Sequence, residues 1–154
     1  MTVPKEKVLA AYSKAKSPRK VMLENLFGIK TFQPDIMKRI KTFDDVCRET
    51  GKNPKDYICT STDPDDIAAN ALKQALLIRR CFNADKKEVL DWTNSDQRKY
   101  LHVYELSPSS GWSLDDVAYW DSDTYCGSRL AFLDPEHAQY AWDQFKEIHI
   151  NLIK

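Results

Sequence analysis

The chain has 154 residues, of which 42% are hydrophobic and 30% charged, the proportions of a folded globular protein. Lys plus Arg and Asp plus Glu are balanced at 23 each, so no net charge draws the chain to nucleic acid or to an anionic membrane, although a local basic patch could still do so. The four glycines lie far apart, which excludes the glycine-rich loops that hold phosphates and dinucleotides. These totals predict a single domain spanning residues 1–154 with no bound cofactor.

The first 20 residues are too charged for a signal peptide, and no apolar run is long enough to span a membrane, so a cytoplasmic protein is expected. The four cysteines are Cys47, Cys59, Cys81 and Cys126. None of them forms a Cys-x-x-Cys pair, which argues against a zinc site. Reduced and mostly buried thiols are the expected state.

Three prolines follow residues that cap helices well, and each pair predicts the start of a helix. These pairs are Ser17-Pro18, Asp63-Pro64 and Asp134-Pro135. Within the helical part predicted for residues 1–83, a first helix is expected over 5–15 and a second over 18–27, ended by Gly28. The second carries a short apolar stripe that includes Val21, Met22 and Leu26.

Residues 34–51 predict a helical turn after Pro34 and then a short helix capped by Thr42 and Asp45 and ended by Gly51. A longer helix starts at Pro64 with a wide apolar face. That face contains Ile67, Ala71, Ala75, Ile78 and Phe82. A last helix over 135–152 has a similar stripe, formed by Ala138, Ala141, Trp142, Phe145, Ile148 and Leu152. Both faces are suited to packing against a sheet or another helix.

Three aromatic-rich segments follow Asn83, at 98–106, 111–120 and 126–133, with turn residues between them. They predict a three-stranded antiparallel meander. The fold class is therefore α+β: N-terminal helices, the meander, and a C-terminal helix packed on the sheet, the last two within 98–153. Helices are expected to cover one face of the sheet and to leave the other face free.

Asp121 and Asp123 follow an apolar run and suggest a site for a divalent cation, with Asp116 as a further candidate ligand. The segment fails as a calcium loop, because Cys126 stands where such a loop needs glycine and Phe132 where it needs glutamate. The preferred interpretation is that both aspartates cap a hairpin loop through local hydrogen bonds. No metal site is predicted.

The histidines and serines do not form a recognisable catalytic set. His137 and His149 lie 12 residues apart, which on a helix separates them by about 120° and excludes a two-histidine metal pair. No serine lies in a Gly-x-Ser-x-Gly motif. Non-enzymatic binding is therefore favoured, with a small enzyme using the three aspartates as the least favoured alternative.

Two segments, 38–51 and 125–153, resemble a family of small uncharacterised proteins from gut bacteria and their phages and prophages. The matching positions are Lys41, Thr42, Phe43, Asp45, Gly127, Ser128, Arg129, Leu130, Phe132, Ala138, Tyr140, Ala141, Gln144 and Phe145. The resemblance covers less than a third of the chain. It implies a mobile-element context and brings no catalytic residues.

Aromatic side chains of the expected sheet are the best candidates for an interaction surface, since Trp and Tyr are enriched at interfaces. The candidate residues are Tyr100, His102, Tyr104, Trp112, Trp120 and Arg129. The favoured function is a phage-type accessory or protein-binding module, with another protein or a second copy of the chain as partner. The alternative is a nucleic-acid-binding factor that stacks bases on the same aromatics beside Arg98 and Lys99.

Overall fold

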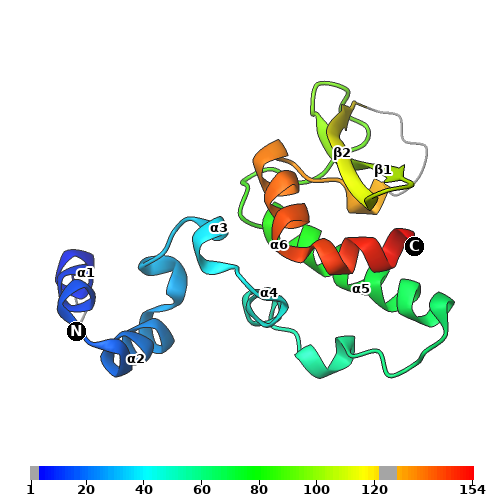
Figure 1. Cartoon of the computed structure of the whole chain (residues 1–154). Helices are drawn as coiled ribbons and strands as arrows, with labels where there is room; N and C mark the ends of the chain where they lie inside the picture. Colours follow the sequence, from blue (N-terminus) through cyan, green and yellow to red (C-terminus); the bar gives the residue numbers. More distant parts are fainter. Residues whose placement is uncertain (1–3, 122–127) are drawn as a thin grey trace. The chain divides into compact units, whose positions relative to one another are not determined.

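The computed structural model describes residues 4–121 and 128–154 and contains two compact units, Met1–Arg39 and Ile40–Lys154 (Figure 1). The single domain expected for 1–154 stays a prediction. The fold class is α+β, as expected. Within the described ranges, no helix has the length and apolar character needed to cross a membrane.

The first unit contains three helices and a 3-10 turn. These are α1 (Lys5–Lys14), α2 (Ser17–Phe27), η1 (Ile29–Thr31) and α3 (Ile36–Arg39). The Tyr12 ring stacks on Phe32 at 4.1 Å between centroids, and the Tyr12 hydroxyl donates to the Glu24 carboxylate. The expected cap at Ser17 is wrong. The carbonyl of Lys16 already accepts from Arg19 and Lys20, so Ser17 is itself the first helical residue.

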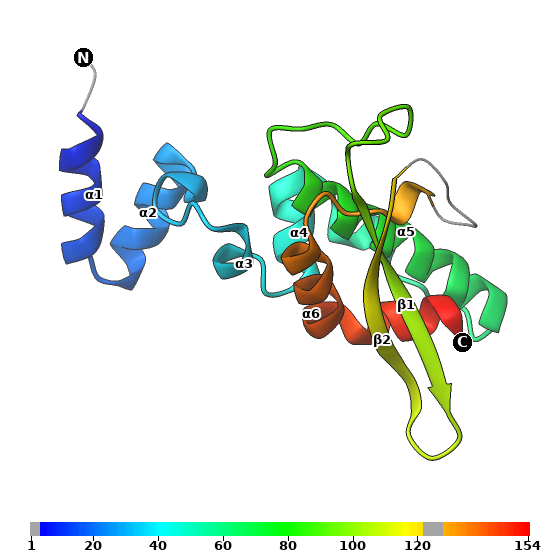
Figure 2. The same ribbon diagram turned by 90° about the horizontal axis from the view of Figure 1, so that it is seen from above.

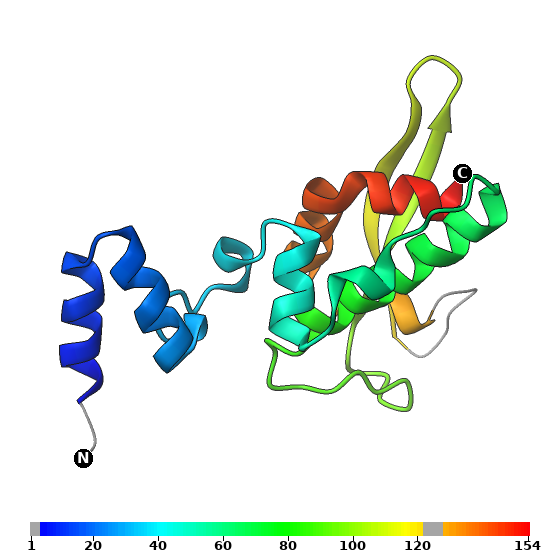
Figure 3. The same ribbon diagram turned by 90° about the horizontal axis from the view of Figure 1, so that it is seen from below.

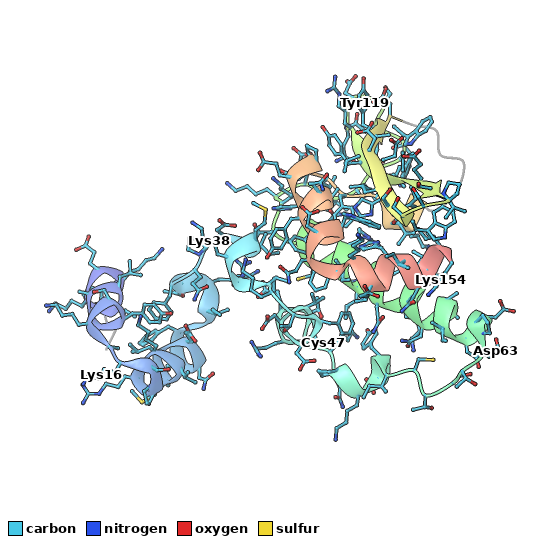
Figure 4. All side chains as sticks on the ribbon, in the orientation of Figure 1. Lys16, Lys38, Cys47, Asp63, Tyr119 and Lys154 are labelled. Atoms are coloured by element: carbon cyan, nitrogen blue, oxygen red, sulfur yellow. The ribbon has the colours of Figure 1, made fainter. Side chains whose placement is uncertain are left out.

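The second unit begins with helices whose caps match the sequence. These elements are α4 (Phe43–Thr50), η2 (Pro54–Tyr57) and α5 (Pro64–Asn83). Thr42 and Asp45 form a reciprocal capping box, and Gly51 ends α4 in the left-handed conformation at φ +66°. Asp63, labelled at the start of α5 in Figure 4, accepts from the backbone of Asp65. The positions of these two helix starts are confirmed.

The sheet has two strands within residues 4–121 and 128–154, so the expected three-stranded meander is wrong. Strands β1 (Lys99–Ser107) and β2 (Gly111–Trp120) form an antiparallel hairpin with a bulge opposite Val103 and Tyr104 (Figure 2). In the described part of the third expected strand, 128–133, Phe132 alone pairs, exchanging backbone hydrogen bonds of 2.8 and 2.9 Å with Tyr100. The turn η3 (Ser128–Leu130) precedes it.

The third segment does not extend the sheet, because the residues next in line to pair with β1 are Leu130 and Asp134, which belong to η3 and to the cap of the last helix. The buried amide of Asn83 satisfies backbone groups of this segment that face away from β1. Its Nδ2 donates to the carbonyl of Ala131 and its Oδ1 accepts from the N–H of Leu133, both at 2.9 Å. Asp134 follows at once as the cap of the last helix, α6 (Pro135–Ile153).

Helix α6 packs against α5 and against the hairpin, and it forms the centre of the second unit (Figure 3). The stripes predicted for both helices contribute to the core. Its buried members include Ala71, Ala75, Ile78, Phe82, Phe132, Ala138, Ala141, Trp142 and Phe145. The backbone of α6 departs from helical values at Phe145, where φ is −123° and ψ is 31°.

Candidate functional site

A cavity of about 410 Å³ lies in the second unit, where α5, β1, η3 and α6 meet. Its lining is mostly apolar and comes from Ala75, Leu101, Leu130, Phe132, Leu152 and Ile153. His102, Tyr104 and His149 complete the wall. A mostly apolar cavity of this size with a few polar groups is typical of sites for small molecules, which span about 300–1,000 Å³.

A chain of hydrogen bonds joins the three polar residues of the wall. His102 Nε2 lies 2.7 Å from the carbonyl oxygen of Ala138 in α6, and His102 Nδ1 lies 3.2 Å from the Tyr104 hydroxyl. The same hydroxyl lies 3.1 Å from Nδ1 of His149. His102 and Tyr104 alternate along β1 and so share one face, and His149 comes from the C-terminal half of α6. These hydrogen bonds thus connect the hairpin to α6.

Both histidines are neutral, which fixes the direction of every bond in this chain. Burial lowers the pKa of His149 to about 3, assisted by the nearby His102, and burial also lowers the pKa of His102. The carbonyl of Ala138 can only accept, so His102 carries its proton on Nε2 and accepts at Nδ1 from the Tyr104 hydroxyl. That hydroxyl has no second proton, and His149 must therefore donate to it from Nδ1.

This arrangement leaves Nε2 of His149 as a lone-pair acceptor. The side chain is 3% exposed, and Nε2 is buried with no hydrogen-bond partner. A buried polar atom without a partner is uncommon, because its lost hydration is not replaced. His149, which lines the cavity, therefore carries one acceptor that has no partner among the described residues.

The same pKa shifts bear on catalysis. A general base works best when its pKa lies near the ambient pH. His149 is far too acidic for that role, and burial raises the pKa of the Tyr104 phenol, which keeps it protonated. The wall is suited to holding a ligand rather than to moving a proton.

The residues predicted as an interaction surface do not lie together on one free face. His102 and Tyr104 contact α6, with ring centroids 6.4 and 5.5 Å from Trp142. Trp112 is paired opposite Leu106 on the same face of the hairpin, whereas Trp120 is paired opposite Lys99 on the other face. Tyr100 bonds to Phe132 through its backbone, and Arg129 is exposed on η3.

Two cations suggested for nucleic-acid binding have partners within the second unit. Lys99 is fully buried, and its Nζ donates to the carbonyls of Asn94 and Asp121. Arg98 lies over the ring of Tyr119, 4.4 Å from its centroid. His102 and Tyr104 lie against α6, so they do not form one stacking surface with Arg98, and nucleic-acid binding stays a prediction.

The aspartates proposed as metal ligands are not brought together by the described residues. Asp116 is exposed at the bulge and accepts from the N–H of Val117 at 2.7 Å. Asp121 is exposed at the end of β2, and Asp123 lies outside the described residues, as does the expected loop cap. In residues 4–121 and 128–154, no cluster of three or more His, Cys, Asp or Glu could hold a metal ion.

Cys47 and Cys81 are buried and Cys59 is half-buried, none of the three forms a disulfide, and Cys126 is outside the described ranges. Burial raises the pKa of Cys47, which makes it a poor nucleophile.

The chain matches no protein-family model, no curated protein and no solved structure.

Proposed function

We propose that the chain is a non-enzymatic binding protein whose second unit holds a small, mostly apolar molecule in the cavity beside His149. The observation that carries this proposal is a mostly apolar cavity of about 410 Å³ whose lining includes a neutral histidine with an unpaired, buried Nε2. The expected ligand has one hydrogen-bond donor on an apolar body. An accessory role in a phage or prophage stays a prediction from the resemblance of 38–51 and 125–153.

Thermal unfolding with a matched pair of probes tests this proposal. Indole and benzofuran have nearly the same shape, but only indole has an N–H group to donate to His149. A ligand that binds the folded state raises Tm, and at equal concentration the ligand of higher affinity raises it more. We expect indole to raise Tm more than benzofuran at equal concentration.

A cavity-filling variant locates the binding. Leu152 is half-buried and lines the cavity, so Leu152→Trp should fill part of it and abolish the effect of indole. Leu72 lies on α5, is 39% exposed and does not line the cavity, so Leu72→Trp is the matched control and should respond like the wild type. Equal Tm shifts for both probes, or an unchanged shift in Leu152→Trp, would refute the proposal.

A second candidate function, self-association, rests on α2 in the first unit. None of its residues is buried, and its predicted stripe is exposed, with Met22 at 54% and Leu26 at 68%. Apolar side chains gathered on one helix face are typical of protein interfaces. Sedimentation velocity should show a dimer that Met22→Glu with Leu26→Glu dissociates and that Lys20→Glu, on the same helix, leaves intact. A monomeric wild type at high concentration would exclude this candidate.

A further inference from the structure

Three arginines line a second pocket of about 430 Å³ in the second unit, separate from the cavity beside His149. Arg79 and Arg80 come from the last turns of α5, and Arg129 comes from η3. The remaining wall includes Trp92, Leu90 and Leu133, and a single acidic residue, Glu88. No residue of this pocket also lines the first cavity.

None of the three guanidinium groups is paired with a carboxylate among the described residues. Neither a hydrogen bond nor an ion pair joins any of them to another side chain within 4–121 or 128–154, and Nε of Arg79 is buried without a partner. Burial, followed by the charges of Arg80 and Arg129, lowers the pKa of Arg79. Like charges held together without a carboxylate destabilise the fold, and a bound anion would remove that repulsion.

Two nearby features oppose an anion, and in both the acceptor oxygens already have hydrogen-bond donors within the protein. Glu88 is exposed, and its Oε2 lies 3.5 Å from Nε2 of Gln97. The C-terminal end of α5 carries partial negative charge, but its last carbonyls are occupied. The carbonyl oxygens of Arg80, Phe82 and Asn83 accept from the next turn of backbone at 3.0–3.2 Å.

We infer that this pocket binds the phosphate group of a phosphate monoester, with the organic part of the ligand against Trp92 and Leu133. Guanidinium groups match phosphate oxygens through paired N–H donors, and three positive charges suit a dianion better than a single carboxylate. The apolar and aromatic wall gives an organic body a surface that free phosphate would leave empty. This inference does not depend on the function proposed for the first cavity.

Isothermal titration calorimetry in a phosphate-free buffer of low ionic strength tests the inference. The ligands are phenyl phosphate, inorganic phosphate and benzoate. We expect phenyl phosphate to bind more tightly than inorganic phosphate, benzoate to bind more weakly than either, and all affinities to fall as NaCl is added. Tighter binding of benzoate, or no binding of phenyl phosphate at millimolar concentration, would overturn the inference.

Variants assign the binding to the arginines. Arg80 and Arg129 are exposed, so Arg80→Gln and Arg129→Gln should fold normally, and each should raise the Kd for phenyl phosphate by about tenfold or more. Lys87→Gln removes the same charge close to the pocket without lining it, and Arg19→Gln removes an arginine from the other unit. Both controls should change the Kd by less than about threefold, as expected for screened charges.

An equal increase in Kd in all four variants would show that binding depends only on net charge and would refute a specific site at the three arginines. A single-stranded oligonucleotide is included as a competing ligand. If it binds through Arg80 and Arg129 while phenyl phosphate does not, the pocket belongs to a nucleic-acid surface and the inference of a phosphate monoester is wrong.

Discussion

The neutral state of His149 predicts that the second unit loses stability when the pH falls below 6.5. The pKa of His149 is about 3 in the folded chain and has its ordinary value of 6.5 in the unfolded one. Below pH 6.5 the unfolded chain binds a proton at this histidine that the folded chain does not bind. The free energy of unfolding therefore decreases as the pH falls from 6.5 toward 3, by about 1.4 kcal/mol per pH unit.

Between pH 6.5 and pH 5 this loss amounts to about 2 kcal/mol for His149. The side chain is 3% exposed, so solvent screening reduces the effect little. The lowered pKa of His102 adds a loss of the same sign. Carboxyl groups contribute little here, because Asp45, Asp91 and Asp134 have pKa values lowered from 3.8 and act below this window.

Urea unfolding at several pH values, followed by circular dichroism, measures this dependence. His149→Asn keeps a side-chain N–H near Tyr104 and cannot titrate, so its free energy of unfolding should fall about 2 kcal/mol less than that of the wild type between pH 6.5 and pH 5. A His102→Gln variant should keep the part of the slope that belongs to His149. If His149→Asn retains the full wild-type slope, the histidine is not buried and neutral as described.

Three further variants probe single features of the fold, each by urea unfolding at pH 7. Tyr104→Phe leaves Nδ1 of both histidines without a partner and should cost about 2–4 kcal/mol, whereas a loss below about 0.5 kcal/mol would contradict the chain of hydrogen bonds. Asn83→Ala removes two buried hydrogen bonds and should also lower the free energy of unfolding by about 2–4 kcal/mol. The control Asn70→Ala removes one half-buried hydrogen bond and should lower it by about 1 kcal/mol. Equal decreases in the two variants would show that the hydrogen bonds of Asn83 contribute no more than that of Asn70. Thr42→Ala removes a helix cap and should cost about 1 kcal/mol, and an unchanged stability would mean that the capping box contributes nothing.

Helix boundaries could be predicted because their determinants are local. The cap of α4 needs only Thr42, Asp45 and Gly51, which lie within ten residues of one another, and the structure forms every contact that this pattern implies. Asp134 likewise accepts from Glu136 and His137, its near neighbours in the sequence. The predicted cap at Ser17 is wrong by one residue. The carbonyl of Lys16 accepts the first hydrogen bonds of α2, so Lys16 is the cap and Ser17 is the first helical residue.

The number of strands could not be predicted from composition. Residues 126–133 have the composition of a strand, and Phe132 does pair with Tyr100 as one would. Within the described residues, Ser128–Leu130 forms a 3-10 turn and Asp134 caps α6, so the segment pairs with β1 at Phe132 alone. The amide of Asn83, 48 residues from Ala131 in sequence, satisfies the backbone groups that face away from β1. Sequence patterns describe the preference of a segment, and here the elements on either side of it limit its pairing.

Part of the lining of the candidate cavity could be predicted from the sequence. Alternation along β1 placed His102 and Tyr104 on one face, as the structure confirms, but the sequence did not show that α6 covers this face. Arg79 and Arg80 lie near the end of α5, and Arg129 follows Arg80 by 49 residues. Their meeting in one pocket depends on η3 packing against α5, which local pattern does not predict.

The angle between the two histidines of α6 follows from the sequence, but its meaning depends on which elements pack against each side of the helix. A separation of about 120° around a helix excluded a shared metal and left each histidine without a role. In the structure α6 has two buried sides: His137 lies 5.4 Å from the ring of Phe82 in α5, and His149 lies 4.7 Å from His102 in β1. The same separation that keeps the rings apart therefore directs one toward the helix and the other toward the hairpin. Only the second position brings a histidine to the cavity, and this is why His149, rather than His137, is the residue whose substitution tests the site.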